Sequence, residues 1–144
     1  MRNEQCGNDF ANGSERMIKN TVLLVLLVGL SLACGPAPDT FGKLDLKKWR
    51  GDRGGCTNVR ATLLPAFRAE IQNLKGNSAN TIGELLGRPD INQIADRNQK
   101  YYIYFLEKGT HCDRPSEKSN SPTVAVRMSA IGLATEITFQ NGTP

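Results

Sequence analysis

A mostly apolar run near the amino terminus constrains this chain more than any other feature. It extends from Val22 to Leu32, with Lys19 before it and the small residue Ala33 after it. A helix that spans a bilayer needs about 20 apolar residues, so the run is too short for a permanent membrane anchor. A positive lead, an apolar stretch of about 7–15 residues and a small residue, in this order, are typical of a signal peptide. The sequence therefore predicts export.

The residue after the small one is Cys34, and residues 30–34 (Leu-Ser-Leu-Ala-Cys) resemble the lipobox of bacterial lipoproteins. The resemblance implies cleavage before Cys34, a diacylglyceryl thioether on its sulfur and an acyl chain such as palmitate on the new amino terminus. The protein would then be anchored by lipid in the bacterial envelope, in the outer membrane facing the periplasm. The alternative is an ordinary secreted protein in which Cys34 is incidental.

The segment before the apolar run does not fit the lead of a signal peptide. Residues 1–16 are polar and carry both signs of charge, whereas a signal peptide opens with a short positive region. Met17 is the better start, and we expect translation to begin there. Residues 1–33, the upstream segment and the signal peptide, would be absent from the mature protein, and Cys6 would be lost with them.

The remaining chain has the length of one domain. Residues 34–55 begin with the lipidated cysteine and a Pro/Gly-rich stretch, and we expect them to form a flexible tether. Residues 56–141 then make the folded domain. The net charge is +4 with both signs interspersed, so the clustered basic footprint of a nucleic-acid-binding protein is missing.

Cys56 and Cys112 predict one disulfide, because an exported protein meets an oxidising compartment. In the chain-entropy model, a bridge that closes so long a loop stabilises the fold by roughly 4 kcal/mol. The alternative is a metal site formed by both cysteines and His111, the only histidine. No Cys-x-x-Cys or His-x-x-x-His spacing supplies a fourth ligand. We therefore expect no metal, and no cofactor apart from the covalent lipid.

Two stretches after Cys56 have helical periodicity. Apolar residues recur at spacings of four and three from 59 to 74, and Pro65 within this pattern predicts either a kink or a helix that begins there. Ser78 is a good N-cap for a second, shorter helix that ends at Gly87.

The rest of the chain has strand patterns. Residues 101–106 are aromatic and branched, residues 123–129 and 133–139 alternate, and residues 91–95 are a weaker candidate. The order of two helices followed by three or four antiparallel strands predicts a two-layer α+β domain of the ααβββ type. Its two N-terminal helices would pack on the sheet.

Residues 75–90 (Lys-Gly-Asn-Ser-Ala-Asn-Thr-Ile-Gly-Glu-Leu-Leu-Gly-Arg-Pro-Asp) resemble the G-x-[ST]-x-x-[EQ]-V-x-x-x-L-G-x-P segment of the small BamE-like (SmpA/OmlA) outer-membrane lipoproteins. The downstream aromatic strand and hairpin match that family's order of elements, a layout shared with β-lactamase-inhibitor-like folds. The resemblance implies a partner in the outer-membrane β-barrel assembly machinery. Thr81 departs from the family's acidic or Gln residue, so the reciprocal capping bond is absent.

No group of residues has the pattern of an active site. His111 lacks a neighbouring Ser or Cys in a nucleophile setting, and no glycine loop has the spacing that binds phosphate. We therefore expect a protein that is not an enzyme.

Three aromatic residues are the candidates for contact with a partner. Tyr102 and Tyr104 share one face of a predicted strand, which would be exposed if the helices cover only the other side. Trp49 either packs on the core or is an exposed contact residue. The first functional hypothesis is a scaffold for outer-membrane protein assembly or envelope integrity. The second is a membrane-tethered inhibitor-like or small-ligand-binding module, which a concave pocket would favour over an open aromatic patch.

Overall fold

The computed structural model describes residues 35–95 and 99–143. The predicted signal peptide, the lipobox and Cys34 lie outside these residues. The chain divides into two units, Met1–Pro36 and Ala37–Pro144, and all elements described below belong to the second. Within the described residues, no helix is both long and apolar enough to span a membrane.

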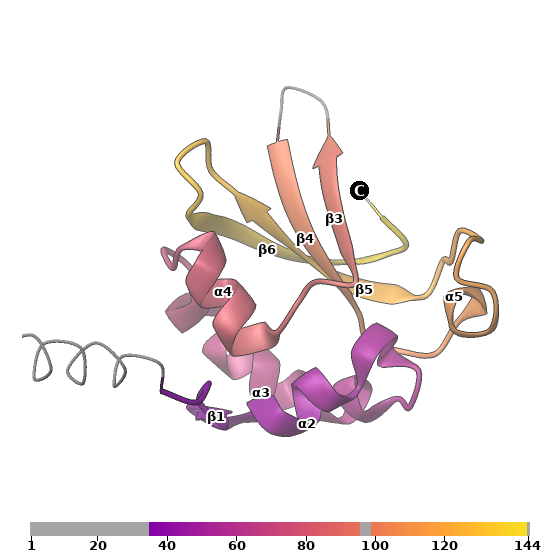
Figure 1. The fold of residues 1–144 in the computed structure, drawn as a ribbon, viewed down its shortest axis with the longest axis horizontal. Coiled ribbons are helices and arrows are strands. Elements are labelled where there is room, and N and C mark those ends of the chain that lie inside the picture. Colours follow the sequence, from indigo (N-terminus) through magenta and orange to yellow (C-terminus); the bar gives the residue numbers. More distant parts are fainter. Residues whose placement is uncertain (1–34, 96–98, 144) are drawn as a thin grey trace, which may run out of the picture. The chain divides into compact units, whose positions relative to one another are not determined.

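A four-stranded antiparallel sheet forms one layer of the second unit (Figure 1). Its strands are neighbours in chain order. In the register of the two central strands, Tyr102 pairs with Val126 and Tyr104 with Val124, and these four residues lie on the face that meets the core. The strands are β3 (Ile91–Ala95), β4 (Gln99–Phe105), β5 (Pro122–Met128) and β6 (Ala134–Asn141).

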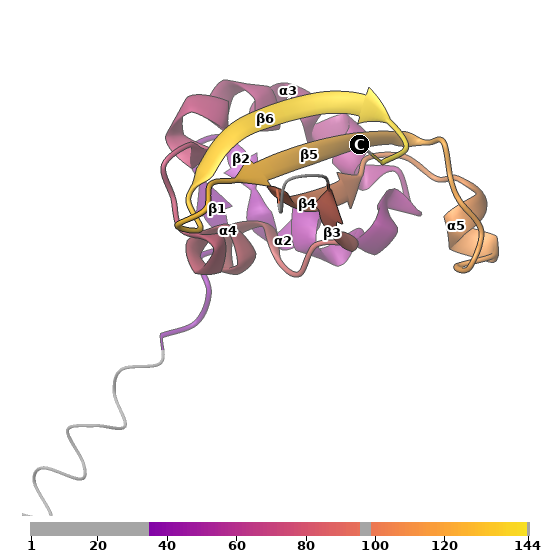
Figure 2. The ribbon, with the colours of Figure 1, turned by 90° about the horizontal axis from the view of Figure 1, so that it is seen from above.

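Helices cover that face of the sheet and form the second layer (Figures 1 and 2). They are α2 (Leu46–Gly51), α3 (Val59–Leu74) and α4 (Ala79–Leu86). Burial of their apolar side chains against the strands is the main force that holds the layers together. The largest apolar side chains of this core are fully buried: Leu44, Leu46, Trp49, Phe67, Leu74, Ile82, Leu86, Tyr104, Val124 and Val126.

The local signals around α4 work as expected. The Ser78 side chain accepts a hydrogen bond from the Thr81 backbone N–H at 3.1 Å, which satisfies one of the unpaired donors of the first turn. Gly87 follows the helix with a φ of 80°, a left-handed conformation that glycine adopts without steric cost. The longer α3 begins at Val59 and contains Pro65 in its interior, so the alternative that a helix begins at Pro65 is wrong.

The flexible tether was predicted too long. Strand β1 (Thr40–Phe41) pairs with β2 (Leu44–Asp45), and α2 follows at once, so the compact unit starts well before residue 56. Asp45 caps α2 by accepting a hydrogen bond from the Lys48 backbone N–H at 2.9 Å. Residues 43–55 hold too few apolar groups for a visible period, and only tertiary packing decides that they are ordered.

The α+β class and the antiparallel sheet are confirmed, but the order differs from ααβββ. The small hairpin, α2 and the 3-10 turn η1 (Arg53–Gly55) precede α3, so the fold does not open with two helices. A further short helix, α5 (Thr110–Asp113), lies between β4 and β5, where no helix was predicted. One helical turn is too short to show periodicity in a sequence.

Candidate functional site

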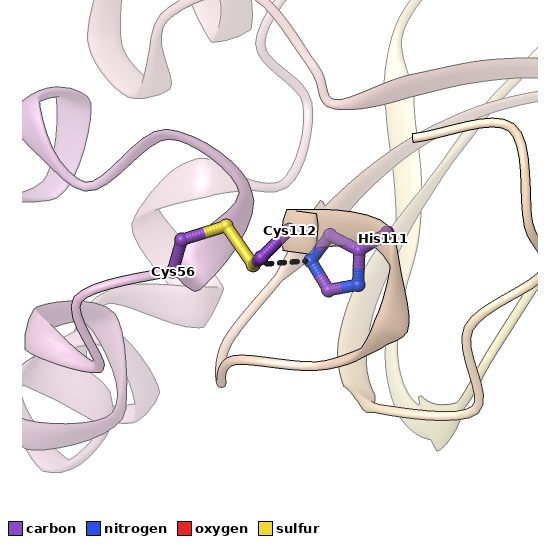
Figure 3. A group of neighbouring side chains, drawn as sticks. All are labelled: Cys56, His111 and Cys112. Atoms are coloured by element: carbon purple, nitrogen blue, oxygen red, sulfur yellow. Dashed lines mark hydrogen bonds between the residues drawn. A yellow bond between two sulfur atoms is a disulfide. The ribbon is translucent and has the colours of Figure 1, made fainter. Parts of the chain in front are cut away.

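The disulfide joins Cys56, directly after η1, to Cys112 in α5 (Figure 3). The two Cα atoms lie 5.8 Å apart and the residues are 56 positions apart in the sequence. The bridge therefore links the segment that precedes α3 to the loop between the two central strands. The predicted pairing is confirmed.

His111 lies beside this disulfide and is held in place on two sides. Its ring stacks on Phe105, with ring centroids 3.7 Å apart and an angle of 14° between the planes. Its Nε2 atom lies 2.7 Å from the Gly54 carbonyl oxygen. The same atom lies 3.5 Å from the Sγ atom of Cys112 (Figure 3). Its Nδ1 atom is buried and has no hydrogen-bond partner within the described residues. His111 directly precedes Cys112, and the tertiary structure adds its contacts with Phe105 and Gly54.

Two glycines before Cys56 allow this approach. Gly54 and Gly55 have φ angles of 72° and 66°, which favour glycine over every other residue. A Cβ atom on Gly55 would lie 2.8 Å from the backbone N of Glu107 and 2.9 Å from the carbonyl oxygen of Phe105. Backbone atoms cannot move aside as a side chain can, so the end of β4 passes η1 at a distance that only glycine permits.

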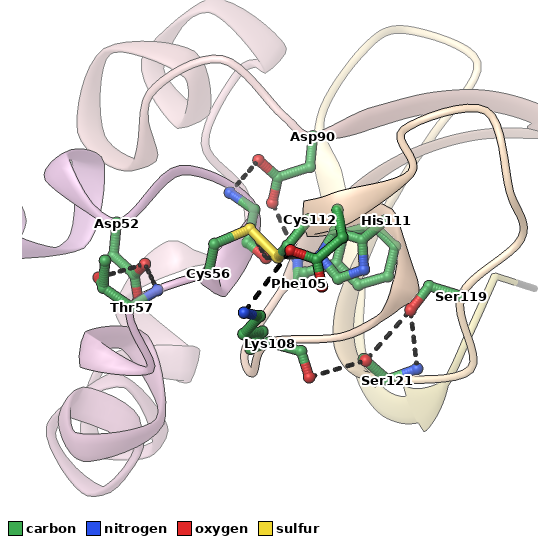
Figure 4. Close-up of a disulfide and its surroundings, with 12 residues drawn as sticks. Asp52, Cys56, Thr57, Asp90, Phe105, Lys108, His111, Cys112, Ser119 and Ser121 are labelled. Atoms are coloured by element: carbon green, nitrogen blue, oxygen red, sulfur yellow. Dashed lines mark hydrogen bonds and ion pairs between the residues drawn. A yellow bond between two sulfur atoms is a disulfide. The ribbon is translucent and has the colours of Figure 1, made fainter.

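A buried ion pair holds together the segments that form the site. Arg60 on α3 is 1% exposed and pairs with Asp90, which lies just before β3. The Arg60 guanidinium also donates to the carbonyl oxygens of Trp49 at 3.1 Å and Phe105 at 3.0 Å. The Asp90 carboxylate accepts from the backbone N–H groups of Gly54 at 3.0 Å and Phe105 at 2.9 Å (Figure 4). These bonds fix η1 and β4 to α3.

Asp52 lies before α3 and accepts hydrogen bonds from groups at the start of this helix. Its carboxylate accepts hydrogen bonds from the Thr57 backbone N–H at 2.8 Å and the Thr57 hydroxyl at 2.6 Å (Figure 4). It also accepts from the Arg60 backbone N–H at 2.8 Å. Burial raises the pKa of Asp52, but these hydrogen bonds and the Arg60 charge outweigh it, so the pKa lies below its ordinary value.

A pocket of about 440 Å³ opens over the disulfide and His111. Of its acidic groups, Asp90 is paired with Arg60 and Glu117 with Arg114. Its cations Arg53 and Lys118 have no anionic partner within the described residues, so the pocket carries an uncompensated positive charge. Its lining comprises Arg53, Gly54, Cys56, Asp90, Ile91, Phe105, His111, Cys112, Pro115, Ser116, Glu117, Lys118, Ser119 and Thr143.

Cys56, Cys112 and His111 do come together in space, as the rejected metal-site alternative required. One ligand atom from each lies within 4.8 Å of the others. In this structure both sulfurs are consumed by their bond to each other, so neither is available as a thiolate.

The predicted aromatic contact residues lie in the core or against it, and not on an exposed face. Trp49 and Tyr104 are fully buried, and the Tyr104 hydroxyl donates to the Gly87 carbonyl oxygen at 3.0 Å. Burial raises the pKa of Tyr104. Tyr104 lies on the face of the sheet that the helices cover, and Trp49 lies on α2, one of those helices. Both are core residues, and neither is available to a partner. Tyr102 alone is half-buried, with the Lys100 ammonium 4.9 Å from its ring centroid.

Sequence reasoning missed Arg60, Asp90, Phe105 and the pocket cations. Arg60 lies off the apolar stripe of α3, where a charged residue normally faces solvent. The only local signal was the pair of glycines before Cys56. It indicates an unusual backbone conformation but does not predict which residues lie against it.

No protein-family model, no curated protein and no solved structure matches this chain. The resemblance to the BamE-like lipoproteins therefore stays a prediction.

Proposed function

We propose that this chain is a bacterial envelope lipoprotein whose folded domain is a non-enzymatic module that binds a small anionic ligand. The observation that carries the proposal is the pocket over the disulfide, with its positive charge and its apolar and aromatic lining. Ligand sites are typically concave, of about 300–1,000 Å³, and lined by apolar groups with a few polar ones. An open aromatic patch, which would have favoured a scaffold, is lost because Tyr104 is buried.

The lining defines the chemistry of the ligand. Phe105 and Ile91 offer apolar surface, His111 is stacked on Phe105, and Arg53 and Lys118 offer cations without anionic partners within the described residues. A small molecule with a planar or apolar body and a carboxylate fits these groups. A cationic ligand would face Arg53 and Lys118 without compensation.

The test is a titration of the oxidised protein, followed by two-dimensional NMR, with small aromatic carboxylates and with the matching neutral amides. We expect saturable shifts at His111 and Phe105 with the carboxylates only. The double variant Arg53→Ala/Lys118→Ala should weaken binding at least about tenfold, because it removes both cations. Lys47→Ala/Arg88→Ala is the control of equal charge, because neither residue lines the pocket. Equal binding of amides and carboxylates, or no binding of either, would contradict the proposal.

Attachment to the envelope rests on the resemblance of residues 30–34 to a lipobox, and the disulfide is consistent with it because such bridges persist in oxidising compartments. In this proposal the signal peptide is removed, Cys34 carries the lipid, and the domain faces the periplasm from the outer membrane. Cells fed a labelled palmitate analogue should label the wild-type protein and the Cys6→Ser control. Label retained by Cys34→Ser would reject Cys34 as the lipidation site.

A second candidate is the scaffold of outer-membrane protein assembly implied by the BamE-like resemblance. The observation that favours it is the edge strand β3, where Ile94 is 72% exposed. In the register Ile94 pairs with Lys100, beside the half-buried Tyr102. An exposed apolar group on a sheet edge is suited to contact with another protein.

Co-purification in mild detergent separates the two candidates. Recovery of a β-barrel assembly protein with the wild type, and its loss with Ile94→Asp, would support the scaffold. Ile131→Asp is the matched control, because Ile131 is also exposed but lies in the turn between β5 and β6. Recovery that Ile94→Asp leaves unchanged would remove β3 from this candidate.

A further inference from the structure

We propose that reduction of the Cys56–Cys112 disulfide creates a binding site for a thiophilic cation such as Zn²⁺, with His111 as its third protein ligand. This inference goes beyond the proposed ligand binding and does not depend on it. The cluster of Cys56, Cys112 and His111 would hold either the disulfide or the metal ion, but never both.

The positions of the ligand atoms fit such a site. The three atoms lie within 4.8 Å of one another, and Nε2 of His111 is 3.5 Å from Sγ of Cys112. A tetrahedral ion with Zn–S of about 2.3 Å and Zn–N of about 2.0 Å places sulfur and nitrogen roughly 3.5 Å apart. The two sulfurs need a separation of roughly 3.8 Å, which rotation of the cysteine side chains reaches once their bond is broken.

The surrounding contacts hold the three residues in place without the covalent bond. His111 remains stacked on Phe105, which fixes the orientation of its ring (Figure 4). The Gly54 N–H donates to Asp90 at 3.0 Å, which anchors the segment before Cys56. The Lys108 N–H donates to the Asn58 side-chain oxygen at 2.8 Å, which ties the loop that carries Cys112 to the start of α3. A site whose ligands are already positioned loses less entropy on binding.

The cluster is also accessible. Cys56, His111 and Cys112 all line the pocket and are only half-buried. A reductant and an ion therefore reach the sulfurs from solvent without an opening of the core. Three protein ligands leave the fourth position of the ion to water, the arrangement found in open zinc sites.

The chemistry balances as follows. A dithiol reductant transfers two electrons and two protons to the disulfide, and is itself oxidised to a disulfide. Cys56 and Cys112 become thiols. Zn²⁺ binds them as thiolates, and the two protons leave to solvent. Coordination through Nε2 replaces its hydrogen bond to the Gly54 oxygen and places the imidazole proton on Nδ1, the atom without a partner within the described residues.

The test uses the full chain in detergent with Cys6→Ser and Cys34→Ser, so that Cys56 and Cys112 are the only cysteines. Oxidised protein and protein reduced with a phosphine are each titrated with Co²⁺, followed by competition with Zn²⁺. We expect the reduced protein to bind one equivalent, with the sulfur-to-cobalt charge-transfer band and the intense visible absorption of tetrahedral cobalt. The oxidised protein should show neither band.

Variants identify the ligands. His111→Ala should weaken binding by the reduced protein at least about tenfold, since loss of a direct ligand costs no less than loss of its supporting group. Cys112→Ser should weaken the charge-transfer band, because one of its two thiolate donors is lost. Circular dichroism shows whether the reduced protein stays folded. If it unfolds, recovery of the native spectrum on addition of Zn²⁺ supports the site.

Three results would overturn the proposal. They are no binding by the reduced protein whether it is folded or unfolded, equal binding by the oxidised protein, and unchanged binding by His111→Ala.

Discussion

The guanidinium of Arg60 and the carboxylate of Asp90 form an ion pair in which the side chains are 1% and 6% exposed. The pair joins α3 to the turn before β3, and it also holds η1 and the end of β4 through their backbone groups. The Arg60 guanidinium carbon lies 5.2 Å from the ring centroid of Trp49 and 5.6 Å from that of Tyr104. Arg60 therefore takes part both in the hydrogen bonds that hold the candidate site and in the packing of the core.

Removal of one partner of this pair should be strongly destabilising. Asp90→Asn leaves the Arg60 charge buried without an opposite charge, and this typically costs about 3–5 kcal/mol of unfolding free energy. Urea denaturation measures the loss. Arg114→Ala, which breaks the exposed pair with Glu117, is the control and should change stability by less than about 1 kcal/mol. Similar losses in the two variants would mean that Asp90 is solvated in solution.

Gly55→Ala should destabilise the fold more than Gly76→Ala. Both glycines have positive φ, which costs an alanine about 1–2 kcal/mol, but a Cβ on Gly76 would meet no atom within 4 Å among the described residues, its chain neighbours apart. At Gly55 the new methyl meets the backbone at the end of β4, which adds an overpacking cost of about 1–3 kcal/mol. Thermal unfolding of the two variants gives the difference. Equal losses would mean that η1 and β4 are farther apart than described.

Loss of the disulfide should lower stability without changing the fold. The double variant Cys56→Ala/Cys112→Ala removes the constraint on the unfolded chain, and we expect a loss of about 2–4 kcal/mol. Denaturant unfolding of the variant and of the oxidised protein gives this value. Native NMR shifts in the core around Trp49 and Phe67 should persist, because those residues pack without help from the bridge. A collapse of these shifts would assign the bridge a larger role in ordering the domain.

Because of Asp52, the domain should be less stable at acid pH than at neutral pH. Its pKa is lower in the folded state than its ordinary value of 3.8, so the unfolded chain binds more protons as the pH falls. The stabilisation from Asp52 is therefore present above the unfolded pKa and is lost as the pH falls through the folded pKa. The free energy of unfolding should be measured between about pH 6 and pH 2.

Asp52→Asn should flatten this curve in its acid limb. The pKa values of Asp45 and Glu70 are also lowered, so the wild-type curve contains their contributions as well. The difference between the two curves isolates Asp52. Parallel curves would show that the hydrogen bonds from Thr57 and Arg60 do not favour its charged form.

Local signals in the sequence predicted part of the fold because they act within a few residues. Ser78 and Gly87 set the ends of α4 through a capping bond and a left-handed residue, and neither depends on distant parts of the chain. Alternation placed β5 and β6 because it has a period of two in any strand, and aromatic and branched residues placed β4. The pairing of Cys56 with Cys112 followed from the number of cysteines and from the expected compartment.

Tertiary packing, and not the sequence pattern of β4, decided which side of the sheet the helices cover. Strand β4 is apolar on both faces: Tyr104 is buried on one face and Ile103 on the other. Alternation cannot choose between two such faces, so the exposed aromatic patch was wrongly predicted. The candidate site was beyond sequence reasoning for a similar reason, because Arg60 and Asp90 are 30 residues apart, and His111 and Gly54 are 57 apart.

By itself the sequence determined the α+β class, the disulfide and the bounds of its best-capped helix, because each depends on residue type and short spacing. Only the tertiary structure decided that Trp49 and Tyr104 are core residues, that Arg60 is buried, and that His111 stacks on Phe105 in the lining of a pocket. These features depend on which distant surfaces meet. The packing of the whole chain makes that choice, and no local segment by itself determines the free energy of that packing.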